Sequence, residues 1–408
     1  MRTYSFFTIA LLCLAIVIID ALAFFWLQAI TDLLTSNTLR NFIHILFWVF
    51  TLGLVIAILT LKLRMNAISP RWKQRLVTSM YGLTVSSFIP KGIFVLLITL
   101  MYYSTLTLPN PKTALWVALF GLIAGFLPFF VIVYAIFGAV YRFKVRRTQL
   151  SFKNLPSTIH NLRIVQISDL HLGSFGFKYK TLDRAIRMIN ELEPDLLFFT
   201  GDLVNNYAWE LRGWDQVFQK LRPKLGAFAV LGNHDYGDYS IWDSAFAKAE
   251  NREAIRQFFE RTPFRLLLNE AVILKRGRDQ LAIIGVENWG KPPFKQYGDL
   301  AKAQKQVPAD AFKILLSHDP SHWEAEVVEN TDIDLTFSGH THGMQVALIV
   351  GKKEYSPIQL KYKQWAGLYS KGNQYLYVNR GLGWMGFPGR IGVRPEITLL
   401  ELVRVQQQ

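Results

Sequence analysis

The fold of the second half of this chain is decided by the stretch RIVQISDLH, residues 163–171. The apolar run over 163–168 predicts a buried strand. Directly after this strand stand two side chains that can bind a cation, Asp169 and His171. Residues i and i+2 of an extended segment point to the same side, so we expect Asp169 and His171 to converge on one ion.

An apolar strand that ends in His, Asp or Asn occurs four more times in the chain. The clusters are Gly201-Asp202-Leu203-Val204-Asn205, Gly232-Asn233-His234-Asp235, Ser317-His318-Asp319 and Gly339-His340-Thr341-His342. Ligands of open α/β sheets bind beyond the carboxyl ends of the strands, where all five clusters fall. Mixed imidazole and carboxylate ligands suit Mn, Fe, Zn or Co better than Ca or Mg.

Each cluster taken alone has a purely structural explanation. An Asp-x-His or a Gly-Asp after a strand is more often a turn or a cap than a metal ligand, and a Gly-His-x-His pair can lie on the surface. Five clusters in one domain, each after a strand, favour a metal site over five unrelated turns. Three histidines fall outside the clusters and are interpreted as structural: His44, His160 and His322.

The remainder of this half alternates short apolar runs with amphipathic stretches. The pattern predicts strands over 163–168, 195–200, 227–231, 271–274, 281–286, 312–317, 335–338, 345–350, 374–378 and 396–402. It predicts helices over 181–192, 209–221 and 245–259. Strands that alternate with helices over this length predict a layered α/β domain.

The first half of the chain is typical of a membrane domain. Hydrophobic residues make up 51% of the sequence and are concentrated before residue 147. Four runs reach the roughly 20 residues that a bilayer span needs: 4–27, 42–63, 83–105 and 114–143. The first run is longer than the apolar core of a signal peptide and lacks a small-residue cleavage site, so we expect it to be retained. The predicted organisation is a transmembrane domain with four spanning helices over 1–147, a basic linker over 148–160 and a catalytic domain over 161–408.

Charge predicts the orientation of the chain in the membrane. Lys and Arg are concentrated between the second and third spans and after the fourth, which places both termini and the C-terminal domain in the cytoplasm. The net charge of +15 arises largely at the ends of apolar runs. That position favours a bilayer with anionic headgroups as the partner, and no nucleic-acid partner is expected. No protein partner can be deduced, and the single cysteine, Cys13, excludes an intrachain disulfide.

Two charged residues lie inside the predicted spans, Asp20 and Lys91. Ionisable residues in hydrocarbon can mark a transport path. Four short spans otherwise show few polar positions. We therefore favour a structural interpretation, in which Asp20 lies in the bundle interior and Lys91 extends toward an interface beside Pro90.

The ordered set Asp-x-His, Gly-Asp-x-x-Asn, Gly-Asn-His-Asp, His and Gly-His-x-His resembles the calcineurin-like metallophosphoesterase superfamily over about 161–403. The tail Asn379-Arg380-Gly381-Leu382-Gly383 with Arg394-Pro395-Glu396-Ile397 resembles its membrane-anchored bacterial branch, which includes enzymes similar to UDP-2,3-diacylglucosamine pyrophosphatases. The resemblance implies a four-layer α/β/β/α sandwich and a location in the bacterial inner (plasma) membrane.

The resemblance also implies roles for individual residues. One divalent ion would be held by Asp169, His171, Asp202 and His342. A second ion, which Asp202 would share, would be held by Asn233, His318 and His340. The catalytic residues would be Asn233, which also faces the phosphate, His234, which stabilises the transition state or protonates the leaving group, and Asp235, which orients the imidazole of His234. The metal, whether Mn, Fe, Zn or Co, stays open.

The substrate is less constrained than the reaction. Hydrolysis of a phosphate ester or pyrophosphate in a lipid-linked substrate is favoured, because the domain follows the last span closely. Trp384 and Phe387 could enter the lipid interface or simply pack over a sheet edge. Hydrolysis of soluble nucleotides or cyclic nucleotides and a non-catalytic membrane sensor or scaffold are the alternatives. The sequence leaves open the choice among monoester, diester and pyrophosphate.

Overall fold

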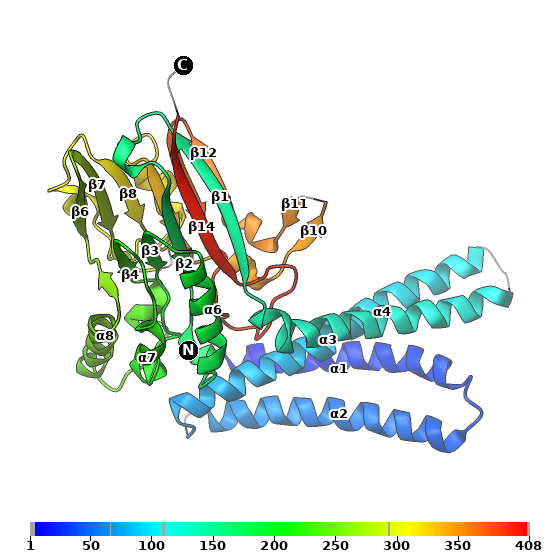
Figure 1. Cartoon of the computed structure of the whole chain (residues 1–408). Coiled ribbons are helices and arrows are strands. Elements are labelled where there is room, and N and C mark those ends of the chain that lie inside the picture. The colour runs from blue at the N-terminus through cyan, green and yellow to red at the C-terminus, as the bar shows by residue number, and fades with distance from the viewer. Residues whose placement is uncertain (1–4, 66, 108–110, 293, 352, 406–408) are drawn as a thin grey trace. The chain divides into compact units, whose positions relative to one another are not determined.

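The structure, a computed structural model, describes residues 5–65, 67–107, 111–292, 294–351 and 353–405 (Figure 1). The chain forms two compact units. A helical unit comprises residues 2–139 together with Gly386–Gly389, and a catalytic unit comprises Val140–Met385 and Arg390–Gln408.

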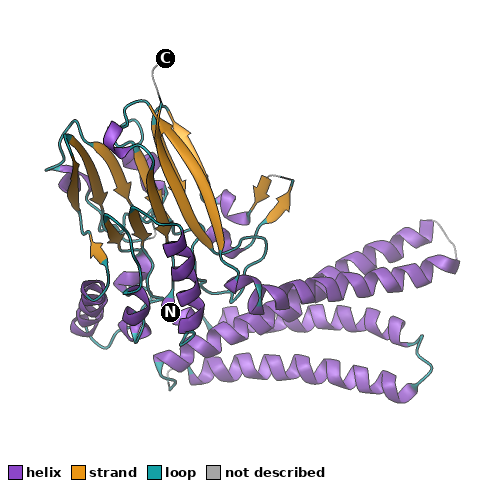
Figure 2. Cartoon of the chain, in the orientation of Figure 1, coloured by secondary structure: helices purple, strands orange, loops and turns teal. Residues whose placement is uncertain are grey.

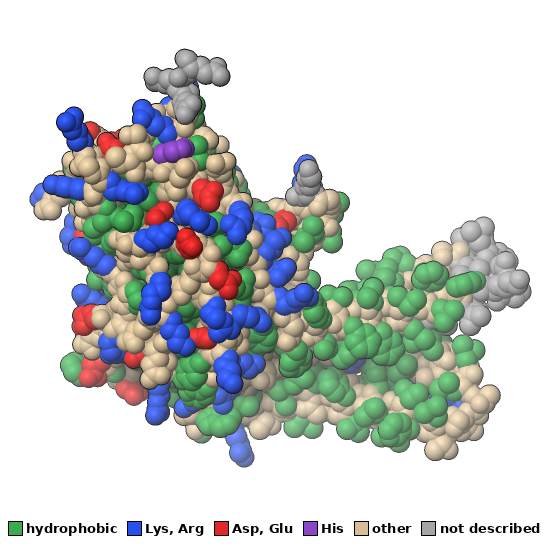
Figure 3. Space-filling view, in the orientation of Figure 1, with side chains coloured by type: hydrophobic (Ala, Val, Ile, Leu, Met, Phe, Trp, Pro, Cys, Tyr) green, Lys and Arg blue, Asp and Glu red, His purple; other side chains and the backbone are tan. Residues whose placement is uncertain are grey.

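The helical unit contains four long apolar helices within the described residues: α1 (Phe6–Thr31), α2 (Asn37–Arg64), α3 (Pro70–Thr107) and α4 (Pro111–Phe137). The side chains of Ser5 and Ser36 cap the first two helices by accepting a backbone N–H of the first turn. Candidate spans run over Phe6–Thr31, Asn37–Arg64, Pro70–Ser104 and Leu119–Tyr141. Hydrophobic side chains dominate the visible surface of these helices (Figure 3), as a lipid environment requires. The four spans predicted from sequence are confirmed, and the protein is a membrane protein.

Asp20 and Lys91 form an ion pair inside the helical unit. The ammonium of Lys91 lies 2.7 Å from Asp20 Oδ2, and the hydroxyl of Thr51 donates to the same oxygen. Asp20 is buried, as expected. The expectation that Lys91 extends to an interface is wrong, because the carboxylate of α1 provides a partner within the bundle. A buried pair of this kind satisfies both charges and needs no transport function.

Two six-stranded sheets form the centre of the catalytic unit (Figure 2). The first sheet has the order β1 (Lys144–Phe152), β14 (Glu396–Arg404), β2 (Leu162–Ile167), β3 (Leu196–Thr200), β4 (Gly226–Val230) and β5 (Phe264–Leu266). The second has the order β12 (Gly367–Lys371), β13 (Gln374–Val378), β9 (Leu335–Ser338), β8 (Phe312–Leu316), β7 (Asp279–Gly285) and β6 (Glu270–Arg276). Strands β2 to β5 run parallel, as do β7, β8, β9 and β13. A separate hairpin pairs β10 (Leu348–Val350) with β11 (Lys353–Tyr355).

Apolar side chains separate the domain into four layers. One buried cluster joins residues of both sheets, such as Phe198 and Phe337, whose rings lie 5.3 Å apart between centroids. A second cluster packs the first sheet against α6 (Tyr179–Glu191), α7 (Asp215–Phe218) and α8 (Ala245–Glu260). A third packs the second sheet against α9 (Leu300–Gln304) and the helical turn Trp323–Val327. The predicted α/β/β/α sandwich is therefore confirmed.

The structure differs from the sequence predictions at the start of the catalytic unit. The basic linker expected over 148–160 is wrong in its first part, because β1 extends to Phe152 and pairs with β14 along its whole length. Alternate residues of β1 are polar and exposed while Leu150 and Phe152 are buried, a pattern that fits an edge strand better than a linker.

Two further elements differ from expectation. The helix predicted over 209–221 is interrupted: a 3-10 turn covers Ala208–Leu211, Gly213 adopts a φ of 78°, and α7 starts only at Asp215. Glycine tolerates this left-handed conformation, which ends a right-handed helix. The strand predicted over 345–350 is shortened to β10, because the 3-10 turn His342–Gln345 precedes it.

Trp384 belongs to the core of the catalytic unit. Its ring is buried against Phe175 and Tyr141, with centroid distances of 4.7 and 5.6 Å. Of the two interpretations given to this residue, packing is correct and contact with lipid is wrong. Replacing Trp384 would therefore destabilise the domain and would not report on the substrate.

Candidate metal centre

Five strands place the candidate site residues together at the carboxyl ends of the two sheets. In the first sheet, β2, β3 and β4 are adjacent and parallel, and they end just before Asp169, Asp202 and Asn233. In the second sheet, β8 and β9 are adjacent and parallel, and they end just before His318 and His340. Because the carboxyl ends of these strands meet, the five loops that follow them converge.

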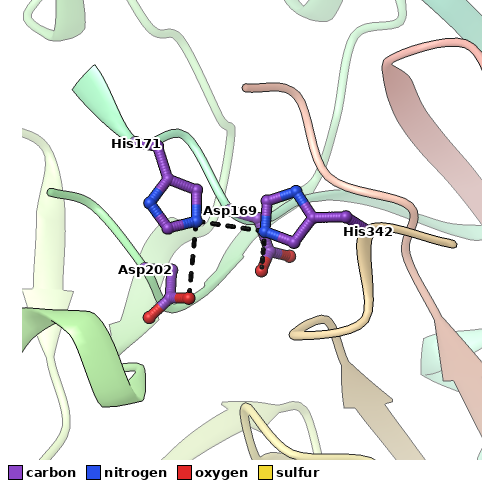
Figure 4. A group of neighbouring side chains, drawn as sticks. All are labelled: Asp169, His171, Asp202 and His342. Carbon is purple, nitrogen blue, oxygen red and sulfur yellow. Dashed lines mark hydrogen bonds and ion pairs between the residues drawn. The ribbon is translucent and has the colours of Figure 1, made fainter. Parts of the chain in front are cut away.

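The first group of converging side chains comprises Asp169, His171, Asp202 and His342, all buried (Figure 4). His171 Nε2 lies 3.0 Å from His342 Nε2 and 3.5 Å from Asp202 Oδ2. His342 Nε2 lies 3.2 Å from Asp169 Oδ1. One ligand atom from each of the four residues lies within 4.8 Å of the others, which is compact enough to surround a single ion.

The second group comprises Asp202, His318 and His340. His318 Nε2 lies 3.3 Å from Asp202 Oδ2 and 3.2 Å from Asn233 Oδ1. Asn233 Oδ1 also lies 2.8 Å from His340 Nδ1, so its amide oxygen faces both imidazoles. The ring of His318 is oriented by the carbonyl of Thr200, which accepts from Nδ1 at 2.6 Å and leaves Nε2 directed at the group.

Asp202 is common to both groups. Its Oδ2 atom faces His171 of one group and His318 of the other. Burial opposes ionisation of this carboxyl, but the facing histidines hold the pKa of Asp202 well below its ordinary value. Burial lowers the pKa of His171 to about 3, which keeps a lone pair available for a cation. The donor set of carboxylates and imidazoles suits a divalent metal ion.

The backbone at these residues is unusual. Five of the residues have a positive φ: Asp169 (52°), His171 (45°), Asp202 (59°), His340 (72°) and His342 (51°). Asp169 and His171 do converge, as expected. The extended backbone that was expected to bring them together is wrong, because both residues are left-handed. Left-handed residues other than glycine cost energy and gather at functional sites, where the surrounding structure enforces them.

Close packing of the loops explains two glycines in the motifs. A Cβ on Gly339 would lie 2.0 Å from Ser168 Oγ, and a Cβ on Gly232 would lie 2.3 Å from Asp202 Oδ1. Neither position could carry a side chain without displacing a loop that holds a candidate ligand. These glycines therefore allow the close approach of loops from different strands.

His234 lies beside the first group, with its ring centroid 5.0 Å from that of His171. Its Nδ1 atom faces the backbone carbonyl of Asn205 at 2.7 Å. A carbonyl can only accept, so Nδ1 carries the proton and Nε2 is left with its lone pair. Asn205, in the Gly-Asp-x-x-Asn block, thus orients this imidazole through its main chain.

Asp235 does not orient His234, and that expectation is wrong. Its carboxylate accepts four backbone N–H groups, from Asp202, Leu203, Val204 and Gly232, at 2.8–3.1 Å. Burial and the charge of Asp202 raise the pKa of Asp235 to about 7, against the opposing effect of these donors. Asp235 fastens the loop after β3 to the loop after β4, and thereby fixes the backbone of Asp202.

Replacing Asp235 by Asn is expected to lower the stability of the catalytic unit by about 3 kcal/mol, because the amide nitrogen cannot accept the N–H groups that now bind two carboxylate oxygens. The midpoint of thermal unfolding should fall by about 5–10 °C. The exposed Asp243→Asn is the matched control and should leave the midpoint unchanged. Unaltered stability in Asp235→Asn with a large loss of turnover would instead support a chemical role beside His234.

Three residues of the site were not found from the sequence. The hydroxyl of Tyr362 lies 2.8 Å from His340 Nε2, and the hydroxyl of Tyr239 accepts from Asn233 Nδ2 at 2.9 Å. The buried carboxylate of Glu210 accepts backbone N–H groups of Asn205 and three other residues. None of the three stands in a strand-end cluster, so no sequence signal singled them out.

Comparison with known proteins agrees with this geometry. Residues 162–344 match the family model of the calcineurin-like phosphoesterases, and residues 1–139 match the model "Probable Calcineurin-like phosphoesterase, transmembrane domain". A transmembrane protein with a metallophosphoesterase domain from Danio rerio is 28% identical over 66% of this chain. The chain spans 60% of the length of that relative.

For two bacterial relatives, the match with this chain extends over a larger share of the relative's own length. The uncharacterized metallophosphoesterase YkuE of Bacillus subtilis is 31% identical over 61% of this chain and 81% of its own length. The UDP-2,3-diacylglucosamine pyrophosphatase LpxG of Chlamydia trachomatis is 32% identical over 63% of this chain and 88% of its own length. With the fold, the strand-end motifs and the paired ligand groups, these similarities show that the chain belongs to the calcineurin-like phosphoesterase family.

Proposed function

We propose that this protein is a metal-dependent phosphoesterase that hydrolyses a phosphate ester or pyrophosphate of a membrane-associated, lipid-linked substrate. The observation that carries the proposal is Asp202, whose carboxylate faces both ligand groups. A shared carboxylate between two sets of imidazoles is the arrangement expected of a two-ion centre. One ion would be held by Asp169, His171, Asp202 and His342, and the other by Asp202, Asn233, His318 and His340.

Two divalent ions supply such a site with a water of lowered pKa and with charge that offsets the phosphoryl oxygens. The chain's own residues position the metal ligands and transfer the proton. Tyr362 and the carbonyl of Thr200 hold the imidazoles of His340 and His318 in position. The carbonyl of Asn205 occupies Nδ1 of His234, so Nε2 is the nitrogen that can take up a proton and pass it to the leaving oxygen. These fixed partners leave little reorganisation to be made during the reaction.

Membrane association supports a lipid-linked substrate. The catalytic unit begins at Val140, where the last candidate span ends at Tyr141. The relative LpxG carries the name of a pyrophosphatase that acts on UDP-2,3-diacylglucosamine. The Lys and Arg bias of the loops supports a cytoplasmic catalytic domain in the inner membrane of a bacterium. Soluble nucleotides are the alternative substrates to be compared, because the same metal ligands could hydrolyse a lipid-linked phosphate or a nucleotide.

The test is turnover of bis(p-nitrophenyl) phosphate by the full chain in detergent after removal of metal by a chelator. We expect turnover to vanish and to return with Mn²⁺, Zn²⁺, Co²⁺ or Fe²⁺, but not with Ca²⁺ or Mg²⁺ alone. Turnover that survives complete chelation would contradict the metal-dependent mechanism.

The kcat/KM values of the metal-reloaded protein for different substrates then identify the substrate class. A lipid-linked diphosphate should be hydrolysed with a higher kcat/KM than nucleotides or cyclic nucleotides. The reverse order would favour the soluble alternative and leave the helical unit as an anchor.

A further inference from the structure

The hairpin of β10 and β11 exposes a run of aliphatic side chains beside the metal centre. Leu348, Ile349 and Val350 are 68%, 55% and 57% exposed. The two strands pair only with each other among the described strands, and they project from the body of the catalytic unit (Figure 1). Successive residues of a strand point to opposite faces, so β10 presents apolar side chains on both faces.

Such a hairpin is poorly suited to water. An isolated two-stranded hairpin is marginally stable in water, and a contiguous exposed apolar patch marks an interaction site. Met344 and Leu360, on the turns before and after the hairpin, are also exposed. The composition of β10 is therefore better explained by an apolar environment around its tip than by packing within the domain.

The base of the hairpin, in contrast, is held firmly. Glu354 of β11 forms ion pairs with Arg146 at 2.6 Å and with Arg380 at 2.7 Å. The backbone N–H of Ala347 donates to the carbonyl of Ile391 at 2.8 Å, and the hydroxyl of Ser356 donates to the carbonyl of Gly343 at 2.9 Å. The hairpin thus carries its aliphatic tip on a fixed support.

Cations surround this base. A pocket of about 370 Å³ between the edge strands β1 and β12 is lined by the exposed Lys144 and Arg147, and by Arg146 and Arg380, whose charges are paired with Glu354. Lys353 stands on the hairpin itself. Aliphatic side chains next to Lys and Arg match the two chemistries of a bilayer surface, acyl chains and anionic headgroups. A soluble protein partner would explain the apolar tip without explaining the exposed Lys144, Arg147 and Lys353 beside it.

Chain connectivity limits how far the base of the hairpin can lie from the last candidate span. Arg146, the partner of Glu354, stands five residues after Tyr141, where the last candidate span ends. Five residues of extended chain cover at most about 18 Å. The base of the hairpin therefore lies within a short distance of the end of that span.

We propose that the β10–β11 hairpin inserts Leu348, Ile349 and Val350 into the interface of the bilayer that holds the helical unit. The turn His342–Gln345, which carries the candidate ligand His342, leads into β10 within a few residues. Insertion would hold this side of the metal centre against the headgroups. A lipid-linked phosphate could then reach the centre while its acyl chains stay in the membrane, a consequence that rests on the proposed function.

The experiment places an NBD fluorophore on single cysteines of the full chain in vesicles of zwitterionic and anionic phospholipid. The native Cys13 is replaced by Ala, and cysteine is introduced at 348, 349 or 350. The matched control is Arg278→Cys, in the turn between β6 and β7 at the opposite edge of the second sheet. Nitroxide-labelled lipids report the depth of each probe, and circular dichroism with metal content verifies folding.

Insertion predicts a blue shift, a severalfold rise in emission and strong quenching by nitroxide lipids at all three hairpin positions, and none of these at position 278. Probes at 348–350 that stay as water-exposed as the control would overturn the proposal. Burial of the hairpin probes without nitroxide quenching would also overturn it, in favour of a protein contact. Neither readout uses turnover, so failure here is distinct from failure of the proposed function.

Discussion

Phosphodiester hydrolysis should fall by at least about a thousandfold when Asp202 is replaced by Asn, since the several kcal/mol of charge stabilisation that two ions supply would be lost with the residue that joins their sites. The neutral amide of Asn removes the negative charge from the position of Oδ2, which His171 and His318 now face at 3.5 and 3.3 Å. The side chain keeps its size, so the loop after β3 should retain its shape.

Metal content separates this explanation from simple misfolding. The parent should bind two ions per chain by elemental analysis, and Asp202→Asn should bind one or none with an unchanged circular dichroism spectrum. Asp310→Asn, at an exposed position outside the site, is the control and should match the parent in both measurements. A variant that keeps two ions and its turnover would refute the bridging role of Asp202.

The second large effect is expected from His234→Gln, with kcat lowered by about a hundred- to a thousandfold. Gln can still donate to the carbonyl of Asn205, which His234 Nδ1 contacts at 2.7 Å, but it cannot transfer a proton. Metal content should stay at the parent level, because His234 belongs to neither ligand group. The exposed His160→Gln serves as the control.

The leaving group distinguishes proton transfer from other roles. An alkyl alcohol must be protonated as it departs, whereas p-nitrophenolate can leave without a proton. The loss in His234→Gln should therefore be much larger for alkyl esters than for p-nitrophenyl esters at saturating substrate. Equal losses for both would assign His234 to binding the phosphoryl group.

The site could be predicted from sequence because its polar clusters each follow an apolar run. Each cluster follows a short apolar run that was predicted to be a strand, and the carboxyl ends of adjacent parallel strands lie at a common edge of the sheet. That rule predicted that the five clusters lie close together, and the resemblance to the metallophosphoesterases predicted which side chains share an ion, such as Asp169 with His342 and Asp202 with His318. The α/β/β/α layers followed from the resemblance, and the packing of both sheets confirms them.

The features of the site that the sequence could not predict arise from contacts between loops. Asp235 stands next to His234, so a side-chain contact was the natural expectation. Its carboxylate instead accepts four backbone N–H groups from the loops after β3 and β4. Tyr239 and Tyr362 lie in loops without a periodic pattern, and only the fold brings them to Asn233 and His340. The left-handed backbone at His171 likewise has no local signature.

The position of β14 between β1 and β2 constrains how the protein is made. β1 pairs only with β14 within its sheet, so it has no partner until residues 396–404 have been synthesised. The apolar helices, which emerge from the ribosome much earlier, can enter the membrane while β1 and β2 are still separate strands. Assembly therefore proceeds in two stages, with insertion first and closure of the catalytic sheet after nearly all of the chain is made. The metal centre, which depends on that sheet, would form only on a polypeptide already fixed in its membrane.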